Sequence, residues 1–98
     1  MDFEWDAGKS RRNYVKHGIR FEDASLIFSG IVLTAVDKRH DYGEERRISI
    51  GAIGDIIVIV VVHTNRSGKI RIISARRANK KERSSYHEFC KNIKKKNR

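Results

Sequence analysis

Residues 56–77 read IIVIVVVHTNRSGKIRIISARR, and this stretch decides the fold. Residues 56–64 are apolar or β-branched at almost every position, which is typical of a central strand buried on both faces. "NRSG" at residues 65–68 is a turn sequence, so residues 69–77 should return as an antiparallel strand beside the first. We therefore expect a hairpin at the centre of an antiparallel sheet.

Two more strands precede this hairpin. Residues 31–37 are rich in β-branched side chains, and residues 45–52 alternate between apolar and polar positions. The polar segment between them contains Gly43, as expected of a hairpin loop.

Helices should flank the four strands. Asp6 is a typical N-cap for a helix that ends near Gly18, and residues 21–28 fit a second helix. After the strands, Asn79 and Glu82 have the spacing of a capping box. The helix that follows carries an apolar stripe of Tyr86, Phe89, Cys90 and Ile93. The expected fold is α+β: a four-stranded antiparallel sheet with two N-terminal helices and one C-terminal helix, in the order ααββββα.

Composition favours one small domain. The chain has 98 residues, of which 39% are hydrophobic and none is proline, so we expect a single domain over residues 1–98 with a frayed basic end at 94–98. The longest apolar run, residues 56–62, is far shorter than the roughly 20 residues of a membrane-spanning helix. The acidic N-terminus differs from a signal peptide, and the single Cys90 has no neighbours at zinc-ligand spacing. These features predict a cytoplasmic protein without a bound metal or cofactor.

Positive charge is concentrated at one end of the sequence. Residues 1–68 contain ten basic and ten acidic side chains, whereas residues 69–98 contain twelve basic side chains and two acidic ones. The whole net charge of +10 therefore lies in the last 30 residues. Such a block favours polyanionic partners, because each neutralised phosphate releases counterions.

Arginines inside the last apolar strand need an explanation. Regular alternation puts Arg71 with Ile73 on one face and Arg76 with Ile72 on the other, so either choice of core face includes an arginine. These arginines could form ion pairs with Asp37, Glu44, Glu45 or Asp55, or they could bind phosphate through their planar donor groups. The N-terminus of the last helix also attracts anions. We favour a phosphate site at this corner, where four cations converge: Arg76, Arg77, Lys80 and Arg83.

Proton-transfer residues are harder to identify from the sequence. His63 ends the central strand, and Tyr86 lies one helical turn after Arg83. Histidine is the usual acid or base near neutral pH. Each of these side chains also has an ordinary structural interpretation, His63 as a strand residue and Tyr86 as a core residue with its hydroxyl at the surface. Both interpretations stay open at this stage.

Three blocks of the sequence resemble a known family. "FEWDAGKSRRNYVKHGIRFEDA", "DYGEERRISIG" and "VVVHTNRSGKIRIISARRANKKERSSY" are similar to the BrnT-type toxin family, over residues 3–86. The resemblance implies a RelE-like fold and a toxin that cuts RNA and stops translation. It also implies a cognate antitoxin with a ribbon-helix-helix DNA-binding part, and it leaves open whether the toxin forms a homodimer within the toxin–antitoxin complex. The matching positions are Lys9, Lys16, His17, Glu45, Arg46, His63, Thr64, Arg66, Arg71, Ser74, Arg76, Glu82, Arg83 and Tyr86.

The resemblance and the basic corner together predict a metal-independent endoribonuclease. RNA cleavage by the 2′-hydroxyl needs a base, cations around the pentavalent phosphate, and an acid for the leaving 5′-oxygen. The expected catalytic residues are Arg66, Arg76, Arg83, Tyr86 and His63. The expected substrate-binding residues are Lys9, His17, Arg71, Arg77 and Lys80. The alternatives are a non-catalytic basic nucleic-acid-binding module and an interaction protein that receives an acidic partner segment.

Overall fold

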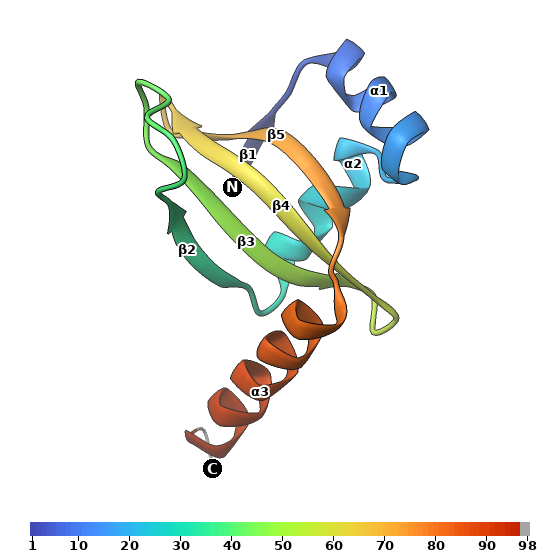
Figure 1. Cartoon of the computed structure of the whole chain (residues 1–98), viewed down its shortest axis with the longest axis vertical. Helices are drawn as coiled ribbons and strands as arrows, with labels where there is room; N and C mark the ends of the chain where they lie inside the picture. Colours follow the sequence, from blue (N-terminus) through green and yellow to red (C-terminus); the bar gives the residue numbers. More distant parts are fainter. Residues whose placement is uncertain (97–98) are drawn as a thin grey trace.

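A computed structural model of the chain describes residues 1–96 (Figure 1). In chain order its elements are β1 (Asp2–Glu4), α1 (Ala7–His17), α2 (Phe21–Ala24), the 3₁₀ helix η1 (Ser25–Ser29), β2 (Leu33–Asp37), β3 (Arg46–Ile53), β4 (Ile57–Arg66), β5 (Lys69–Arg77) and α3 (Lys80–Lys96). The α+β class is confirmed. No helix among residues 1–96 is long and apolar enough to span a membrane.

The sheet has five strands, so the expectation of four antiparallel strands is wrong in this detail. The strand order is β1-β5-β4-β3-β2, and the three pairs from β5 to β2 are antiparallel. The additional strand, β1, pairs in parallel with β5, with Phe3 opposite Ile70 and Glu4 opposite Arg71. Three residues carry too little periodicity to predict a strand. Their conformation depends on an edge that a distant part of the chain provides.

Helices α2 and η1, which directly precede β2, cover one face of the sheet (Figure 1). The helix predicted over residues 21–28 is divided into the single turn of α2 and the 3₁₀ helix η1. Their side chains Phe21 and Ile27 pack against Ile59 and Ile72 from the two central strands. We call this side of the sheet the core face.

Hydrogen bonds attach α1 to the core face, because its apolar surface is small. Asn13 is buried, and its side-chain amide donates to the carbonyl oxygens of Ile19 and Ala75, both at 2.8 Å. Its Oδ1 accepts from the Ala75 N–H at 3.2 Å. The Ser10 hydroxyl accepts from the Phe21 N–H at 3.0 Å. These bonds position α1 against β5 without a large hydrophobic contact.

The opposite side of the sheet has no helix over most of its length in the described part of the chain (Figure 1). Helix α3 packs on one end of this face, where Tyr86 and Ala78 meet Val58 and Val60. It then extends away from the sheet. We call this side the open face. The helix continues through residues 94–96, where the sequence predicted a frayed end, and residues 97–98 lie outside the described range.

A β-bulge decides which residues of β5 belong to which face. Val62 is opposite Ser74, but the next residue of β4, His63, is opposite Ile72, so Ile73 has no partner. Both Ile72 and Ala75 are consequently buried in the core face. The expectation of unbroken alternation is therefore wrong. The additional residue turns Arg71, Ser74 and Arg76 together toward the open face, and it keeps arginine out of the core.

Candidate phosphate-binding corner between β5 and α3

The last helix begins with a complete capping box. The Glu82 N–H donates to Oδ1 of Asn79 at 2.8 Å, and the Asn79 N–H donates to Oε1 of Glu82 at 2.9 Å. This confirms the helix start that the sequence predicts. It also brings the end of β5 and the first turn of α3 into one corner, with Arg76, Lys80 and Arg83 around it.

Arg76 is the best-positioned cation of this corner. Its two terminal nitrogens donate to the two carboxylate oxygens of Glu82 at 2.8 and 2.9 Å. The hydrogen bonds from Arg76 lower the pKa of the Glu82 carboxyl to about 2, against the opposing effect of partial burial. The Arg76 side chain is still 45% exposed. A planar guanidinium that already holds two oxygens in this way can hold a phosphate in the same way.

Arg83 lies one turn along α3 from the capping box. Its Nη1 donates to the carbonyl oxygen of Ala78 at 2.8 Å, which holds the side chain back toward the strand end. The structure therefore brings Arg76, Arg83 and the exposed Lys80 to the corner, as predicted. Arg77 is opposite Ile59, a core-face residue, and so leaves the strand on the other side from Arg76.

A second group of arginines lies at the other end of the open face. The Arg71 guanidinium is 3.7 Å from a Glu4 carboxylate oxygen, and Arg66 is 3.4 Å from Glu44. Arg66 and Arg71 thus both pair with carboxylates. The ion-pair alternative is therefore present in the structure, but the two β5 arginines Arg71 and Arg76 pair with Glu4 and Glu82 and not with the expected partners.

Two arginines of the loop before β3 and of β3 itself, Arg39 and Arg46, have no role that the sequence pattern predicts, apart from the match of Arg46 to the family pattern. Arg39 donates to both oxygens of Asp37, at 2.8 and 2.9 Å, and Tyr42 adds a third bond at 3.1 Å. These bonds, above all those from the Arg39 side chain, hold the pKa of the Asp37 carboxyl well below its usual range. The Arg46 guanidinium lies 4.0 Å above the ring of Tyr42. Arg39 follows a strand in the polar loop, so no sequence period could place it here.

His63 is part of the core face. It is 5% exposed, its Nε2 is 2.7 Å from the Ser49 hydroxyl, and its ring meets the ring of Phe28 edge-on at 5.0 Å. Burial, followed by the charge of Arg47, lowers the pKa of His63 to about 4. The structure therefore places this imidazole on the opposite side of the sheet from Arg76, away from the corner.

Tyr86 is buried at the base of α3. Its hydroxyl donates to the Ile31 carbonyl oxygen at 2.8 Å, and burial, followed by the adjacent Cys90, raises its pKa to about 12. Tyr86 lines one cleft together with Arg83, so it lies near the corner. Lys9 and His17 belong to α1, which contacts β5 through the bonds of Asn13 to Ala75.

A cleft continues from the corner along α3. It has a volume of about 510 Å³ and lies between α3, the segment before β2 and the turn from β3 to β4. Ile31 and Val58 contribute its apolar surface, and Arg83, His87 and Lys94 contribute cations or an imidazole from α3. Within residues 1–96 no group of three or more His, Cys, Asp or Glu side chains could hold a metal ion.

Comparison with known proteins identifies the family. The family described as the ribonuclease toxin BrnT of type II toxin–antitoxin systems matches residues 5–82. The crystal structure of the Brucella abortus ribonuclease toxin BrnT is similar to this fold, with 26% sequence identity and a TM-score of 0.62, covering 82% of this chain and 99% of that one. Comparison with curated protein sequences found no match. The family match spans more than half of the chain, and the chain belongs to the BrnT family of ribonuclease toxins of type II toxin–antitoxin systems.

Proposed function

We propose that this toxin is a metal-independent endoribonuclease whose phosphate site is the corner between β5 and α3. The observation that carries the proposal is the convergence of Arg76 and Arg83 at the N-terminus of α3, on an accessible part of the open face. Guanidinium groups and free helix N–H groups both favour a phosphate that gains negative charge. Lys80 adds a third cation in the first turn.

The proposed reaction is an in-line transfer at phosphorus. The 2′-oxygen of one nucleotide loses its proton and attacks the adjacent phosphate, the bond to the 5′-oxygen breaks, and that oxygen takes up a proton. The products are a 2′,3′-cyclic phosphate and a 5′-hydroxyl end. Arg76 and Arg83 stabilise the pentavalent phosphate, and Arg76 exchanges the Glu82 carboxylate for phosphate oxygens when substrate binds.

Tyr86 is the proton donor that the geometry favours. A tyrosine with a pKa of about 12 stays protonated at neutral pH, so it suits the role of general acid for the leaving 5′-oxygen. It lines the same cleft as Arg83. His63 is buried beside Phe28 and Ser49, so we assign it a structural role instead of the proton-transfer role that was open in the sequence.

Of the other residues expected to take part, we keep Arg66 and Arg71 as RNA-binding residues and leave out Lys9 and His17. Arg66 and Arg71 contact further RNA phosphates along the open face, at the end of the sheet where they pair with Glu44 and Glu4. Lys9 and His17 lie on α1, so a substrate-binding role for them would require RNA to pass around the edge of the sheet. We therefore place the RNA path on the open face, without α1.

The biological role that we propose follows from the family. The toxin cleaves RNA in the cytoplasm, stops translation, and is neutralised by a cognate antitoxin with a ribbon-helix-helix DNA-binding part. A homodimer of the toxin within the toxin–antitoxin complex is part of the same proposal. The alternative, a non-catalytic basic nucleic-acid-binding module, is favoured by one observation: His63, a residue expected to transfer a proton, lies on the core face and not beside Arg76.

Cleavage of labelled single-stranded RNA in EDTA tests the proposal, with protein freed of antitoxin. We expect fragments with 5′-hydroxyl ends, and a loss of about 100- to 1,000-fold in rate for Arg76→Ala and for Arg83→Ala. Arg77→Ala is the matched control, because Arg77 neighbours Arg76 but leaves the strand on the core-face side. Full cleavage by folded Arg76→Ala and Arg83→Ala proteins would contradict the assignment, and salt-sensitive binding without cleavage would favour the binding module.

A further inference from the structure

The part of α3 beyond the corner, residues 84–96, lies outside the family match, which ends at residue 82. Residues 84–96 contain four basic side chains and one acidic side chain, a net charge of +3. This segment continues α3 away from the sheet (Figure 1). The ribonuclease family match therefore does not account for its charge.

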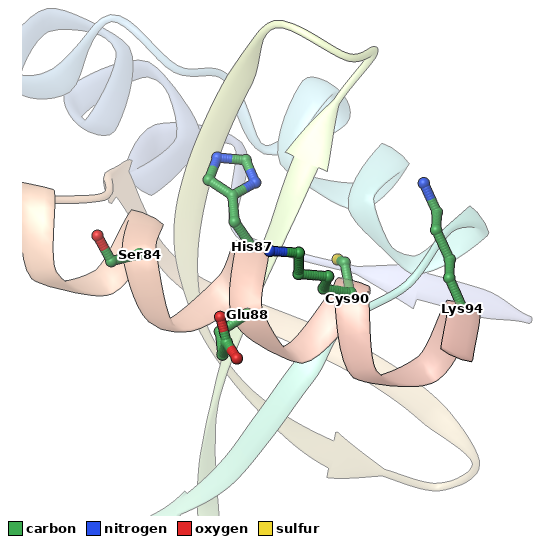
Figure 2. Close-up of a pocket in the computed structure, with 6 residues that line it drawn as sticks. Ser84, His87, Glu88, Cys90 and Lys94 are labelled. Atoms are coloured by element: carbon green, nitrogen blue, oxygen red, sulfur yellow. The ribbon is translucent and has the colours of Figure 1, made fainter. Parts of the chain in front are cut away.

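These cations are not distributed evenly around the helix. With 3.6 residues per turn, Arg83, His87, Lys91 and Lys94 fall on one side, next to the stripe of Tyr86 and Cys90 that packs toward the sheet. His87 and Lys94 extend to the same side of α3, whereas Glu88 extends to another side (Figure 2). Arg83 and Lys94 are 11 residues apart, a distance of about 16 Å along the helix.

The cleft described above runs beside this row of side chains. Its cations come from α3, its apolar surface includes Ile31 and Val58 from the sheet side, and Asp55 in the turn before β4 is its one acidic lining residue. Arg83 belongs both to the cleft and to the phosphate-binding corner, so the two regions are continuous. A row of positive charge beside an apolar surface, joined to a phosphate site, matches a linear polyanion with apolar groups attached to it.

We infer that the Arg83–Lys94 side of α3 binds the backbone of single-stranded RNA next to the nucleotide held at the corner. Lys91 and Lys94 contact phosphates, and the bases or sugars of this segment lie toward the apolar side of the cleft. The identity of the ligand rests on the proposed function. The surface itself rests on the positions of these side chains and on the net charge of the segment.

A non-cleavable ligand separates this inference from the ribonuclease proposal. A fluorescent 2′-O-methyl RNA oligonucleotide lacks the attacking hydroxyl, so its affinity can be measured at several salt concentrations without cleavage. Each phosphate contact with single-stranded nucleic acid contributes about 0.7 to the slope of log K against log salt. Lys91→Ala/Lys94→Ala should therefore lower this slope by about 1.4 and weaken binding about 25-fold at 0.1 M salt.

The matched control is Lys81→Ala/Lys96→Ala, which removes the same charge from exposed positions on the other side of α3. We expect it to change affinity less than about threefold, and circular dichroism should show equal helix content in both variants. An equal loss of RNA affinity in the two variants would show that only the overall charge of the protein matters, and it would overturn the inference. Unchanged RNA binding together with weaker antitoxin binding in Lys91→Ala/Lys94→Ala would also overturn it, in favour of an acidic protein segment. If wild-type protein fails to cleave unmodified RNA but the two variants differ as predicted, only the ribonuclease proposal fails.

Discussion

The Arg76 guanidinium and the Glu82 carboxylate form two parallel hydrogen bonds across the corner between β5 and α3, at 2.8 and 2.9 Å. The same carboxylate accepts from the Asn79 N–H in the capping box. One acidic side chain therefore starts the helix and positions the arginine proposed to bind phosphate. In the proposed mechanism, substrate replaces this carboxylate at Arg76, so the free protein would hold its candidate site in an ordered but occupied state.

Glu82→Gln should lower stability by at most about 1 kcal/mol at pH 7, because water screens this partly exposed pair and a glutamine can still cap the helix. The pKa of Glu82 is lowered to about 2 in the folded protein, so the contribution of its charge is complete above its unfolded pKa, near 4.3, and is lost as pH falls toward 2. Urea unfolding at pH 7 and pH 3 checks this. Glu88→Gln on the same helix is the control, and a Glu82→Gln deficit that persists undiminished at pH 3 would contradict the charge argument.

His63 should also make the stability fall as pH is lowered, but over a higher pH range than Glu82. Its folded pKa is about 4, below its usual value near 6.5, so the unfolded chain binds the proton more tightly. The His63 contribution is complete above pH 6.5 and is lost as pH falls toward 4. His63→Leu should remove this part of the pH dependence, whereas His17→Leu, which changes a less buried histidine, should leave it. Identical profiles of stability against pH for wild-type and His63→Leu proteins would show that burial does not lower the pKa of His63 in the folded protein.

Tyr86→Phe tests the proposed general acid. Loss of the hydroxyl should lower RNA cleavage by about 100-fold or more, and lower stability by about 1 kcal/mol because the Ile31 carbonyl loses its donor. Tyr14→Phe on α1 serves as the control, since Tyr14 lies on the core-face side of the molecule and is 44% exposed. A folded Tyr86→Phe protein that cleaves RNA at the wild-type rate would restrict Tyr86 to a structural role.

Gly51→Ala should destabilise the core face. A Cβ at this position of β3 would lie 2.7 Å from the Cβ of Ile27 in η1, closer than two carbon atoms can approach. Overpacking of this kind costs about 1–3 kcal/mol, because Ile27 and its neighbours must shift. Gly30→Ala is the control, since the nearest atom to its added Cβ is 3.9 Å away. The midpoints of urea unfolding compare the two, and equal midpoints would mean that η1 moves freely over the sheet.

Local sequence information was sufficient for the β4–β5 hairpin and for the start of α3. The apolar run of β4, the turn at residues 65–68 and the capping box of Asn79 with Glu82 all depend on neighbouring residues, so the sequence pattern predicts them. The family resemblance also follows from the sequence alone, and the family match over residues 5–82 confirms it.

The candidate site was predictable only in part. The convergence of Arg76, Lys80 and Arg83 follows from one strand meeting one helix, and the structure has it. The separation of His63 from this corner does not follow, because it depends on which sheet face the ring joins. Arg39 also reaches Asp37 from within an irregular loop, where no period guides a prediction.

By itself, the sequence of this protein determined its α+β class, its central hairpin, its basic C-terminal region and its family. Only the tertiary structure decided the fifth strand, the division of the second helix and the faces of β5. For the fifth strand and the faces of β5 the physical reason is strand pairing: β1 needs the edge of β5, and the bulge at Ile73 arises from the pairing of β4 with β5. Contacts between distant residues, and not local preference, therefore turned Arg71 and Arg76 together toward the open face.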